Sequence, residues 1–364
     1  GAGSAGLCTA AALGRRGIPV VVLERGPSVG SSWRQRHEEL RLNTDRWLSS
    51  LPGLRFPRVA GRWVGRDDFV AHLETFTARH ALDVRCGVTV DRLEQDRAGW
   101  RLRTDDRDVD ASDVVIATGH ERVPHIPPWP GRDGFALPLL HVAEIRRVAD
   151  LAGRRVLLVG AGNSGIEMAG QLVDAGVRQL WLSARTPPTI LPLQLAGLPM
   201  DLIGVAARAL PEGVRDAVAR RISRLAIGDL APYGLPAPAM GPYRTLRTTG
   251  VTGAVDRGFA RHLRAGRLEI VGLVERLSED EVLLCDGSSL SPDVVVLATG
   301  FRTGLEPLVG HLGVLDGHGS PLSRPGRAIA GNRGLWFAGF WPALEGALRR
   351  HPVEARRIAR AIAR

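Results

Sequence analysis

Two segments of the sequence have the GxGxxG spacing with which a backbone turn can hold a diphosphate. They are GAGSAG at residues 1–6 and GAGNSG at residues 160–165. In such a turn the first glycine permits the bend, the second lets the backbone approach a pyrophosphate, and the third lets helix and strand pack closely. The helix that follows offers free N–H groups and the positive end of its dipole. The predicted chemistry is dinucleotide binding at two places in one chain.

The first turn has the expected surroundings, a helix over residues 4–16 and an apolar strand over residues 19–24. Glu24 ends that strand, where a carboxylate can accept hydrogen bonds from a ribose. Such a turn also needs a strand before it, so we expect the natural protein to begin upstream of Gly1. The residues expected to bind this nucleotide are Gly1, Gly3, Ser4, Ala5, Gly6, Glu24 and Arg25.

The second turn directly follows the apolar strand at residues 155–159. The next strand ends at Ser183, and no acid stands where an NAD site would carry one. Arg185 can instead pair with a 2′-phosphate, which favours NADP. A surface arginine without a ligand is the alternative, because the chain has 48 basic residues and none of them is a lysine. The residues expected here are Gly160, Gly162, Asn163, Ser164, Gly165, Ser183 and Arg185.

The elements around the two turns repeat. Strand, glycine turn, helix and strand occur twice, and each copy later closes with an apolar strand that ends in Ala-Thr-Gly, at residues 117–119 and 298–300. This predicts an α/β fold of two Rossmann-like domains, one inserted in the other. A proline-rich crossover after residue 123 marks the first boundary. The expected domains cover residues 1–145 and 304–364 for the first fold and 146–303 for the inserted one.

Further elements follow from local patterns. Asp67 and Asp68 can cap a helix that runs to about His80, and a basic amphipathic helix from Arg356 to the end is expected to pack on the first domain. Residues 191–244 exceed a minimal Rossmann unit and contain apolar helical repeats; a lid and a packed helical cap are both open. Strands are expected at residues 84–90, 100–104, 109–111, 114–118, 294–299 and 334–339.

Composition excludes several kinds of chemistry. The 364 residues are 44% hydrophobic and 24% charged, as in a soluble globular chain, and no apolar run reaches the ~20 residues of a membrane span. The absence of lysine excludes a pyridoxal phosphate Schiff base and a P-loop. The net charge of +10 comes from scattered arginines without an aromatic platform, so no nucleic-acid partner is expected.

The three cysteines, Cys8, Cys86 and Cys285, are far apart and form no CxxC pair. This argues against a redox dithiol and a zinc site, so no metal is expected, and it fits a reducing cytoplasm. The sequence leaves the oligomeric state open, with a homodimer as one option.

Six segments of the chain carry a family resemblance. They are GAGSAG at 1–6, ERGPSVGSSW at 24–33, LRLNT at 40–44, ATG at 117–119, GAGNSG at 160–165 and ATGF at 298–301. Together they make the chain resemble the flavin-containing monooxygenases, near the branch that includes the plant YUCCA enzymes. The Ser-Ser-Trp after the acidic strand and the LRLNT segment are the most diagnostic, and the likeness covers nearly the whole chain.

The resemblance implies FAD at the first turn and NADP(H) at the second. It implies an NADPH-consuming monooxygenase that forms a C4a-peroxyflavin and transfers one oxygen atom of O2 to a small organic substrate. Heteroatom (N or S) oxygenation and oxidative decarboxylation of a 2-oxo acid are both open, and Baeyer–Villiger insertion ranks last. Two other functions also remain: an NAD(P)H-dependent flavin reductase that passes on electrons, and a non-catalytic redox sensor or partner subunit.

The resemblance also assigns residues. Ser32, Trp33 and Arg34 would lie beside the FAD phosphates, with ordinary core as the alternative for Trp33. Asn43 is the catalytic candidate, because a positioned amide near the flavin C4a can stabilise an oxygenated flavin by hydrogen bonds; a turn-forming asparagine is the alternative. The remaining expected cofactor contacts are Thr118, Gly119, Thr299, Gly300, Gly339 and Phe340.

Two segments depart from the family pattern. The fingerprint FxGxxxH reads Phe135 to His141 here, with Leu137 in place of glycine, which puts the coupling of NADPH to flavin in doubt. His141 could contact nucleotide or serve as a hydrogen-bonded structural residue. Where relatives have an asparagine-containing stretch near the flavin, this chain has residues 340–346, in which Trp341 and Glu345 could line a substrate pocket or belong to core and surface.

Overall fold

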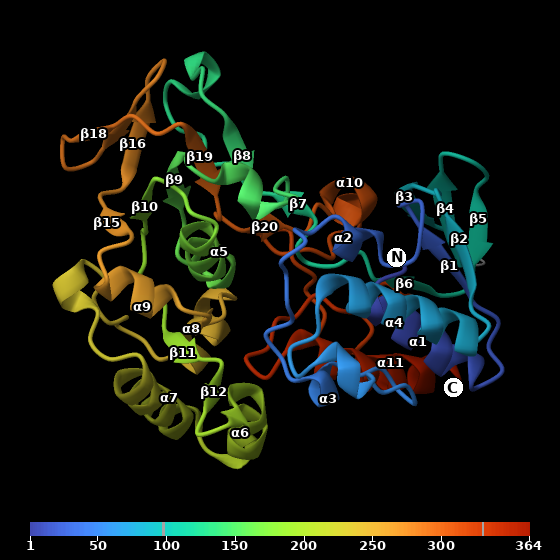
Figure 1. The fold of residues 1–364 in the computed structure, drawn as a ribbon. Helices are drawn as coiled ribbons and strands as arrows, with labels where there is room; N and C mark the ends of the chain where they lie inside the picture. Colours follow the sequence, from blue (N-terminus) through green and yellow to red (C-terminus); the bar gives the residue numbers. More distant parts are fainter. Residues whose placement is uncertain (97–98, 330) are drawn as a thin grey trace. The chain divides into compact units, whose positions relative to one another are not determined.

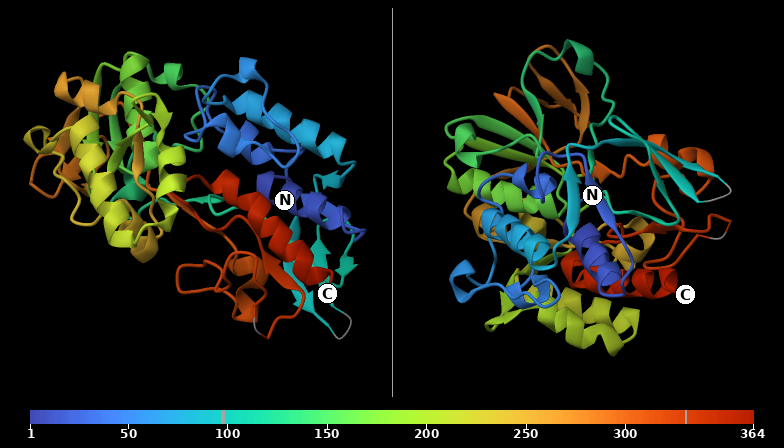
Figure 2. Two further views of the ribbon diagram at one scale, coloured as in Figure 1. Left: turned by 90° about the horizontal axis from the view of Figure 1, so that it is seen from below. Right: turned by 90° about the vertical axis from the view of Figure 1, so that its right-hand side faces the viewer.

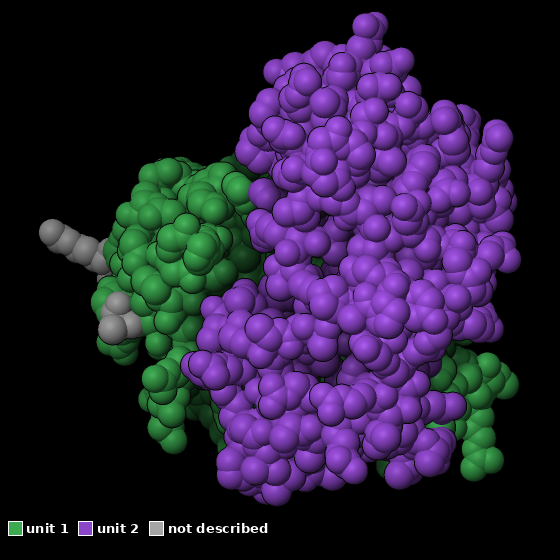
Figure 3. Space-filling model, turned by 90° about the vertical axis from the view of Figure 1, so that its left-hand side faces the viewer, with its two compact units in different colours: residues 1–36, 40–123, 301–364 green, residues 37–39, 124–300 purple. Residues whose placement is uncertain are grey.

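The computed structural model describes residues 1–96, 99–329 and 331–364. The chain forms two compact units, shown in separate colours in Figure 3. Unit 1 comprises residues 1–36, 40–123 and 301–364, and unit 2 comprises residues 37–39 and 124–300. Unit 2 therefore interrupts unit 1 in sequence, as expected for one domain inserted in another.

A parallel five-stranded sheet forms the centre of unit 2. Its inner strands are buried on both faces, which is why residues 155–159 and 294–297 read as continuous apolar runs. The order is β15 (Glu269–Val271), β10 (Gln179–Ser183), β9 (Arg155–Val159), β19 (Val294–Leu297), β8 (Leu139–His141).

The sheet lies between two layers, helices and a small second sheet (Figure 1), and alternate residues of β9 face one or the other. On β9, Val156 and Leu158 pack with α5 (Asn163–Asp174) and α9 (Phe259–Arg264). Leu157 and Val159 pack with an antiparallel three-stranded sheet on the other face. That sheet contains β16 (Val274–Leu277), β17 (Val282–Leu284) and β18 (Ser289–Leu290). Unit 2 thus has three layers with the glycine turn at residues 160–165 between β9 and α5.

A helical insertion, residues 193–253, lies between two short parallel strands of unit 2, β11 (Ile190–Pro192) and β14 (Ala254–Asp256). Helices α7 and α8 pack against each other. The helical repeats expected in residues 191–244 are present, and the insertion continues beyond them through α8. Its elements are β12 (Gln194–Leu195), β13 (Leu198–Pro199), α6 (Met200–Ala206), α7 (Glu212–Ala226) and α8 (Pro242–Thr249).

Helix α1 (Ser4–Gly14) is the centre of unit 1, and every residue from Ser4 to Leu13 is buried. It packs mainly against α11 (Ala347–Ile362) and also against α4 (Arg66–Arg79); Figure 2 shows the first and last helices of the chain side by side. The C-terminal helix therefore packs on the first fold, as expected.

Short strands complete unit 1. Two parallel pairs are β1 (Val21–Glu24) with β2 (Asp83–Cys86) and β6 (Val114–Ile116) with β21 (Leu335–Phe337). An antiparallel meander contains β3 (Val90–Gln95), β4 (Trp100–Thr104) and β5 (Val109–Ala111). The remaining elements are β7 (Val123–Pro124), β20 (Phe301–Arg302), α2 (Ser31–Arg34), α3 (Arg46–Ser49) and α10 (Glu306–Val309).

Several element boundaries differ from expectation. The strand expected over 84–90 is two strands, because Gly87 adopts a φ of +76° and breaks it. Asp67 and Asp68 lie in the first turn of α4 rather than at its cap, which is Gly65. Helix α11 begins at Ala347 instead of Arg356, and it contains Pro352 beyond its first turn, where the missing N–H leaves one i→i−4 hydrogen bond unmade.

The expected range of the first domain ended at residue 145, although the proline-rich crossover marked a boundary after residue 123. In the structure the chain belongs to unit 2 from Pro124, and β8 pairs with β19 of the sheet of that unit. Among the described residues, no helix is both long and apolar enough to cross a membrane. The same residues contain no group of three or more His, Cys, Asp or Glu side chains that could hold a metal ion.

Candidate functional site

The first glycine turn is sterically closed at its two outer glycines, Gly1 and Gly6, and open at the middle one, Gly3. A Cβ atom on Gly6 would lie 2.0 Å from the carbonyl oxygen of Gly1, and one on Gly1 would lie 2.7 Å from that of Ala117. A Cβ on Gly3 would meet no atom of the described residues within 4 Å. The outer glycines thus let helix and strand pack closely, and the middle glycine leaves room for a diphosphate to approach the backbone.

The second glycine turn repeats this pattern. A Cβ on Gly165 would lie 1.9 Å from the carbonyl oxygen of Gly160, and one on Gly160 would lie 2.4 Å from that of Ala298. Again a Cβ on the middle glycine, Gly162, would meet nothing within 4 Å in the described part of the chain. Both turns therefore have the shape that fits a dinucleotide at a helix N-terminus.

The two Ala-Thr-Gly segments lie directly against these turns. Gly119 and Gly300 have φ values of +80° and +86°, which glycine adopts at no steric cost. Their threonines differ: Thr299 donates its hydroxyl to the carbonyl oxygen of His125, whereas Thr118 has a buried Oγ1 with no hydrogen-bond partner among the described residues. A buried hydroxyl of this kind favours a bound polar group at the first turn.

Glu24 is held at the end of β1 by two backbone donors. Its Oε2 accepts the N–H of Ala2 at 2.6 Å, and its Oε1 accepts that of Gly26 at 2.8 Å. Each carboxylate oxygen has a further lone pair. The acid is therefore fixed beside the first turn and can still accept a hydrogen bond from a ribose hydroxyl.

The polar residues of the second turn are arranged differently. Ser183 donates its hydroxyl to the carbonyl oxygen of Gly272 at 2.8 Å, and Asn163 Oδ1 accepts the N–H of Val255 at 3.1 Å. Arg185 is exposed, and no hydrogen bond or ion pair joins it to the described residues. Its guanidinium is available for an anion such as a 2′-phosphate.

The Ser-Ser-Trp-Arg segment forms the short helix α2. Trp33 is half-buried and packs edge-on against Phe69, with ring centroids 4.5 Å apart. Arg34 forms an ion pair with Glu74 of α4. Part of the indole thus belongs to the core of unit 1, while Ser32 and Arg25 are exposed.

Asn43 is half-buried in a segment that is fixed on both sides. Before it, the Leu42 N–H donates to the Val64 carbonyl; after it, Asp45 caps α3 by accepting the Trp47 N–H at 2.9 Å. The next residue, Thr44, lies against the start of α11, where a Cβ on Gly346 would be 2.4 Å from its Cγ2.

The chain after β21 returns to the first turn. A Cβ on Gly339 would lie 2.6 Å from the Cβ of Ala5, so only a glycine permits this approach. Phe340 is buried and packs edge-on against Phe337, with centroids 5.7 Å apart. Gly339 is thus brought to the turn, whereas the Phe340 ring lies in the core.

His141 is a fully buried hydrogen-bonded residue of β8. Its Nδ1 accepts the N–H of Ala143 at 3.1 Å, so the proton lies on Nε2, which donates to the Gly300 carbonyl at 3.0 Å. Phe135 is partly buried against the sheet. These contacts show a structural role at the second Ala-Thr-Gly segment.

Sequence reasoning missed three polar residues near the first turn. Ser4 is hydrogen-bonded to His351 of α11, Glu354 of the same helix accepts the N–H of Gly339, and His120 lies beside Gly339. The only signal was a histidine and a glutamate three residues apart on an otherwise basic helix, which is too common a pattern to predict a contact with Ser4.

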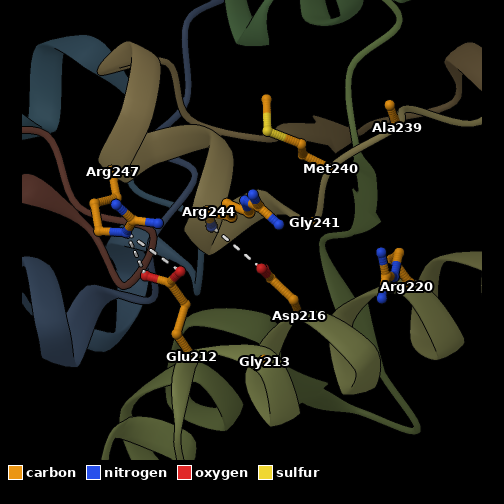
Figure 4. Close-up of a pocket in the computed structure, with 9 residues that line it drawn as sticks. All are labelled: Glu212, Gly213, Asp216, Arg220, Ala239, Met240, Gly241, Arg244 and Arg247. Carbon is orange, nitrogen blue, oxygen red and sulfur yellow. Dashed lines mark hydrogen bonds and ion pairs between the residues drawn. The ribbon is translucent and has the colours of Figure 1, made fainter.

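A separate polar pocket of about 290 Å³ lies in the helical insertion, between α7 and the segment that leads into α8 (Figure 4). Both of its carboxylates are engaged: Glu212 pairs with Arg247 at 3.0 Å, and Asp216 accepts the N–H groups of Tyr243 and Arg244. None of its lining residues belongs to a glycine turn.

Two families of known proteins match more than half of the chain each. Residues 1–188 match the pyridine nucleotide-disulphide oxidoreductases, and residues 99–309 match the flavin-binding monooxygenase-like family. Across most of the chain there is also a 33% identity to indole-3-pyruvate monooxygenase YUCCA1 of Oryza sativa subsp. japonica, covering 93% of this chain and 85% of the relative. The chain belongs to the flavin-binding monooxygenase-like family.

Other relatives agree. Probable indole-3-pyruvate monooxygenase YUCCA9 of Arabidopsis thaliana is 31% identical over 93% of this chain and 83% of its own. Among solved structures, a flavin-containing monooxygenase from Stenotrophomonas maltophilia matches with a TM-score of 0.74 and 23% identity, covering 100% and 97% of the two chains. A steroid monooxygenase bound to NADP gives 0.75 and 20%, covering 100% and 84%. These structures confirm the predicted two-Rossmann fold.

Membership of this family confirms the predicted resemblance and the class of enzyme. The flavin-binding monooxygenase-like chain is an oxidoreductase that uses FAD and NADPH with O2 and acts on a small molecule. The glycine turns, the open approach to each, and the buried hydroxyl of Thr118 fit these two dinucleotides.

Proposed function

We propose that this monooxygenase oxygenates a small organic substrate by heteroatom oxygenation or by oxidative decarboxylation of a 2-oxo acid. The observation that carries the proposal is the pair of turns, each closed at its outer glycines and open at Gly3 or Gly162, which gives one chain two dinucleotide cradles. Relatives named indole-3-pyruvate monooxygenases favour the 2-oxo acid.

The first turn would hold FAD. The N–H groups of Ser4, Ala5 and Gly6 begin α1, where a helix leaves its first donors unsatisfied, and they would bind the diphosphate. Glu24 would accept the ribose hydroxyls, with Thr118, Gly119 and Gly339 completing the site. The expected phosphate contacts of Arg25, Ser32, Trp33 and Arg34, and a contact of Phe340 through its backbone, belong to the same proposal. Bound FAD supplies hydride acceptance and oxygen activation.

The second turn would hold NADP(H), with Gly160, Gly162 and Gly165 forming the turn. Asn163 and Ser164 begin α5 and would donate their N–H groups. Ser183, Thr299 and Gly300 would border the nucleotide, and Arg185 would pair with the 2′-phosphate. Replacing Arg185 by alanine should raise the KM for NADPH about tenfold or more, the size of a charged hydrogen bond, and leave the KM for NADH unchanged. Equal KM changes for both coenzymes would contradict this role.

Asn43 would be the catalytic residue. Its amide, on a segment fixed by Leu42 and Asp45, would donate a hydrogen bond at the flavin site and so favour oxygen transfer to the substrate over the release of hydrogen peroxide. We expect Asn43→Ala to raise the peroxide yield about tenfold while FAD content and the rate of flavin reduction by NADPH stay unchanged. A turn-forming role predicts loss of FAD instead.

The deciding experiment compares products with reductant. The holoenzyme is supplied with NADPH, O2 and either indole-3-pyruvate or a thioether, and oxygenated product, peroxide and consumed NADPH are measured. Product in proportion to NADPH with one of the substrates supports the proposal. NADPH oxidation that yields only peroxide with both substrates would overturn it in favour of a flavin reductase.

Location and assembly complete the proposal. The cysteines Cys8, Cys86 and Cys285 are unpaired in disulfides, which fits a reducing cytoplasm. We propose a cytoplasmic homodimer; light scattering of the holoenzyme at micromolar concentration checks the assembly, and a monomeric mass would contradict it.

A further inference from the structure

A buried set of polar side chains connects the last helix of unit 1 with its first glycine turn. A hydrogen bond of 2.8 Å joins Ser4 Oγ and His351 Nδ1. One turn further along α11, Glu354 Oε2 accepts the N–H of Gly339 at 3.0 Å. Residues three apart share one face of a helix, so a single face of α11 holds both segments.

These side chains are deeply buried. Ser4, His351 and Glu354 are 4%, 9% and 2% exposed. The second carboxylate oxygen of Glu354 has no hydrogen-bond partner among the described residues. Burying polar groups in this way costs free energy unless each hydrogen bond is made, so their placement against the turn is not explained by packing alone.

Burial shifts the pKa values of both titratable members of this set towards their neutral forms. Burial, with smaller effects from His120 and Arg350, lowers the pKa of His351 to about 4. Burial also raises the pKa of Glu354, against the N–H of Gly339 and the charges of Arg350 and Arg357. His351 is therefore an uncharged imidazole that can hold the Ser4 hydroxyl without placing a positive charge in the core.

Ser4 is well placed to transmit this contact. It is the first residue of α1 and directly follows Gly3, the open glycine of the turn. Its backbone N–H is one of the donors that a helix start leaves free for an anion. A side chain fixed from behind restricts the backbone from which that N–H projects.

We propose that His351 is a positioning residue for FAD, which holds Ser4 and thereby fixes the first turn of α1 in the conformation that binds the diphosphate. This rests on the proposed binding of FAD at the first turn. The benefit is pre-organisation, because a turn that is already ordered loses less conformational entropy when the nucleotide binds. Glu354 supports the same arrangement by holding Gly339, whose neighbour across a close approach is Ala5.

The test measures the dissociation constant of FAD from deflavinated protein by flavin fluorescence. His351→Leu and Ser4→Ala should each weaken FAD binding about fivefold, the size expected for one hydrogen bond. The double variant should be no weaker than the single ones, because both remove the same contact. His351→Asn, whose amide reaches the position of Nδ1, should recover most of the affinity.

Thr9→Val is the matched control. Thr9 also has a buried hydroxyl on α1, which donates to the Ala5 carbonyl at 2.8 Å and, in the described structure, not to His351. Thr9→Val should lower the melting temperature about as much as Ser4→Ala and leave the FAD dissociation constant unchanged. NADP+ affinity, measured in parallel, should be unchanged in every variant.

An unchanged FAD dissociation constant in both His351→Leu and Ser4→Ala would overturn the proposal, and so would additive losses in the double variant. Equal weakening of FAD and NADP+ would do so as well, because it would indicate general loss of structure. Failure of the wild-type protein to bind FAD would instead overturn the assignment of the first turn, so the two failures are distinguishable.

Discussion

The two glycine turns of this monooxygenase have the same steric design and different anchors. In both, a Cβ on either outer glycine would collide with a backbone carbonyl oxygen, whereas a Cβ on the middle glycine would meet no atom of the described residues within 4 Å. The fourth residue of the second turn, Asn163, is tied to the backbone of β14, which packs on α5 in the same unit. The corresponding Ser4 is tied to a side chain of α11, 347 positions away.

This difference shows that one backbone design can be held by two kinds of support. The backbone N–H of Val255 is kept by every substitution except proline, and it does not titrate. A side-chain partner such as His351 can be removed and can change charge. We therefore expect the first turn to respond to remote substitutions and to pH, and the second to respond mainly to changes in the turn itself.

The largest effect should come from the third glycines, which the two turns share. In Gly6→Ala and Gly165→Ala the new Cβ would lie about 2 Å from a backbone carbonyl oxygen that cannot move aside. We expect a loss of about 3 kcal/mol or more in the free energy of unfolding for either variant, measured by urea titration. A much larger loss in one of them would break the similarity of the two turns.

The pH dependence of the free energy of unfolding should reveal the titratable partner of the first turn, His351. Because burial lowers the pKa of His351 from 6.5 to about 4, the unfolded chain binds more protons than the folded one between these values. The contribution of the uncharged His351 to the free energy of unfolding is therefore fully present above pH 6.5. It is lost as the pH falls through 4, by about 3 kcal/mol in total.

The same trend is expected from His72, whose pKa burial lowers to about 4, so the comparison must use His351→Leu. Urea unfolding at pH 4.5 and 7.5 should show a smaller pH difference for this variant than for the wild type. Identical pH differences would mean that the charge state of His351 does not affect the first turn.

Substitutions of the two middle glycines should each impair the binding of only one cofactor. In Gly3→Ala a methyl group would occupy the open approach of the first turn, and in Gly162→Ala that of the second. We expect about a hundredfold weaker FAD binding in the former and about a hundredfold higher KM for NADPH in the latter, each near 2.7 kcal/mol, with little loss of apoprotein stability. If either variant weakened both cofactors equally, the turns would not act independently.

The smallest effect should come from the two threonines. Thr299 donates a hydrogen bond to His125, so Thr299→Val should cost the apoprotein about 1 kcal/mol. Thr118 has a buried hydroxyl without a partner in the described residues, so Thr118→Val should not destabilise the apoprotein but should weaken FAD binding about fivefold. Thermal unfolding with and without FAD distinguishes these outcomes. A lower melting temperature of the Thr118→Val apoprotein would contradict the proposed difference between the two threonines.

Local features were predictable because short-range chemistry decides them. The GxGxxG spacing, the apolar runs at residues 155–159 and 294–297, and the acid at Glu24 each follow from neighbours in sequence, and the structure has the expected strands and turns there. Boundaries at Gly87 and Pro352 were not predicted, because a left-handed glycine or a proline inside a helix depends on the packing around it.

By itself the sequence determined the two dinucleotide folds, the insertion of one in the other, and the flavin-binding monooxygenase-like family, because spacing and hydrophobic pattern specify them. Only the tertiary structure decided that His351 reaches Ser4, that Glu354 holds Gly339, and that Thr118 lacks the partner that Thr299 has. Contacts between residues far apart in sequence depend on how α1 and α11 pack, and no local pattern in either helix encodes its partner.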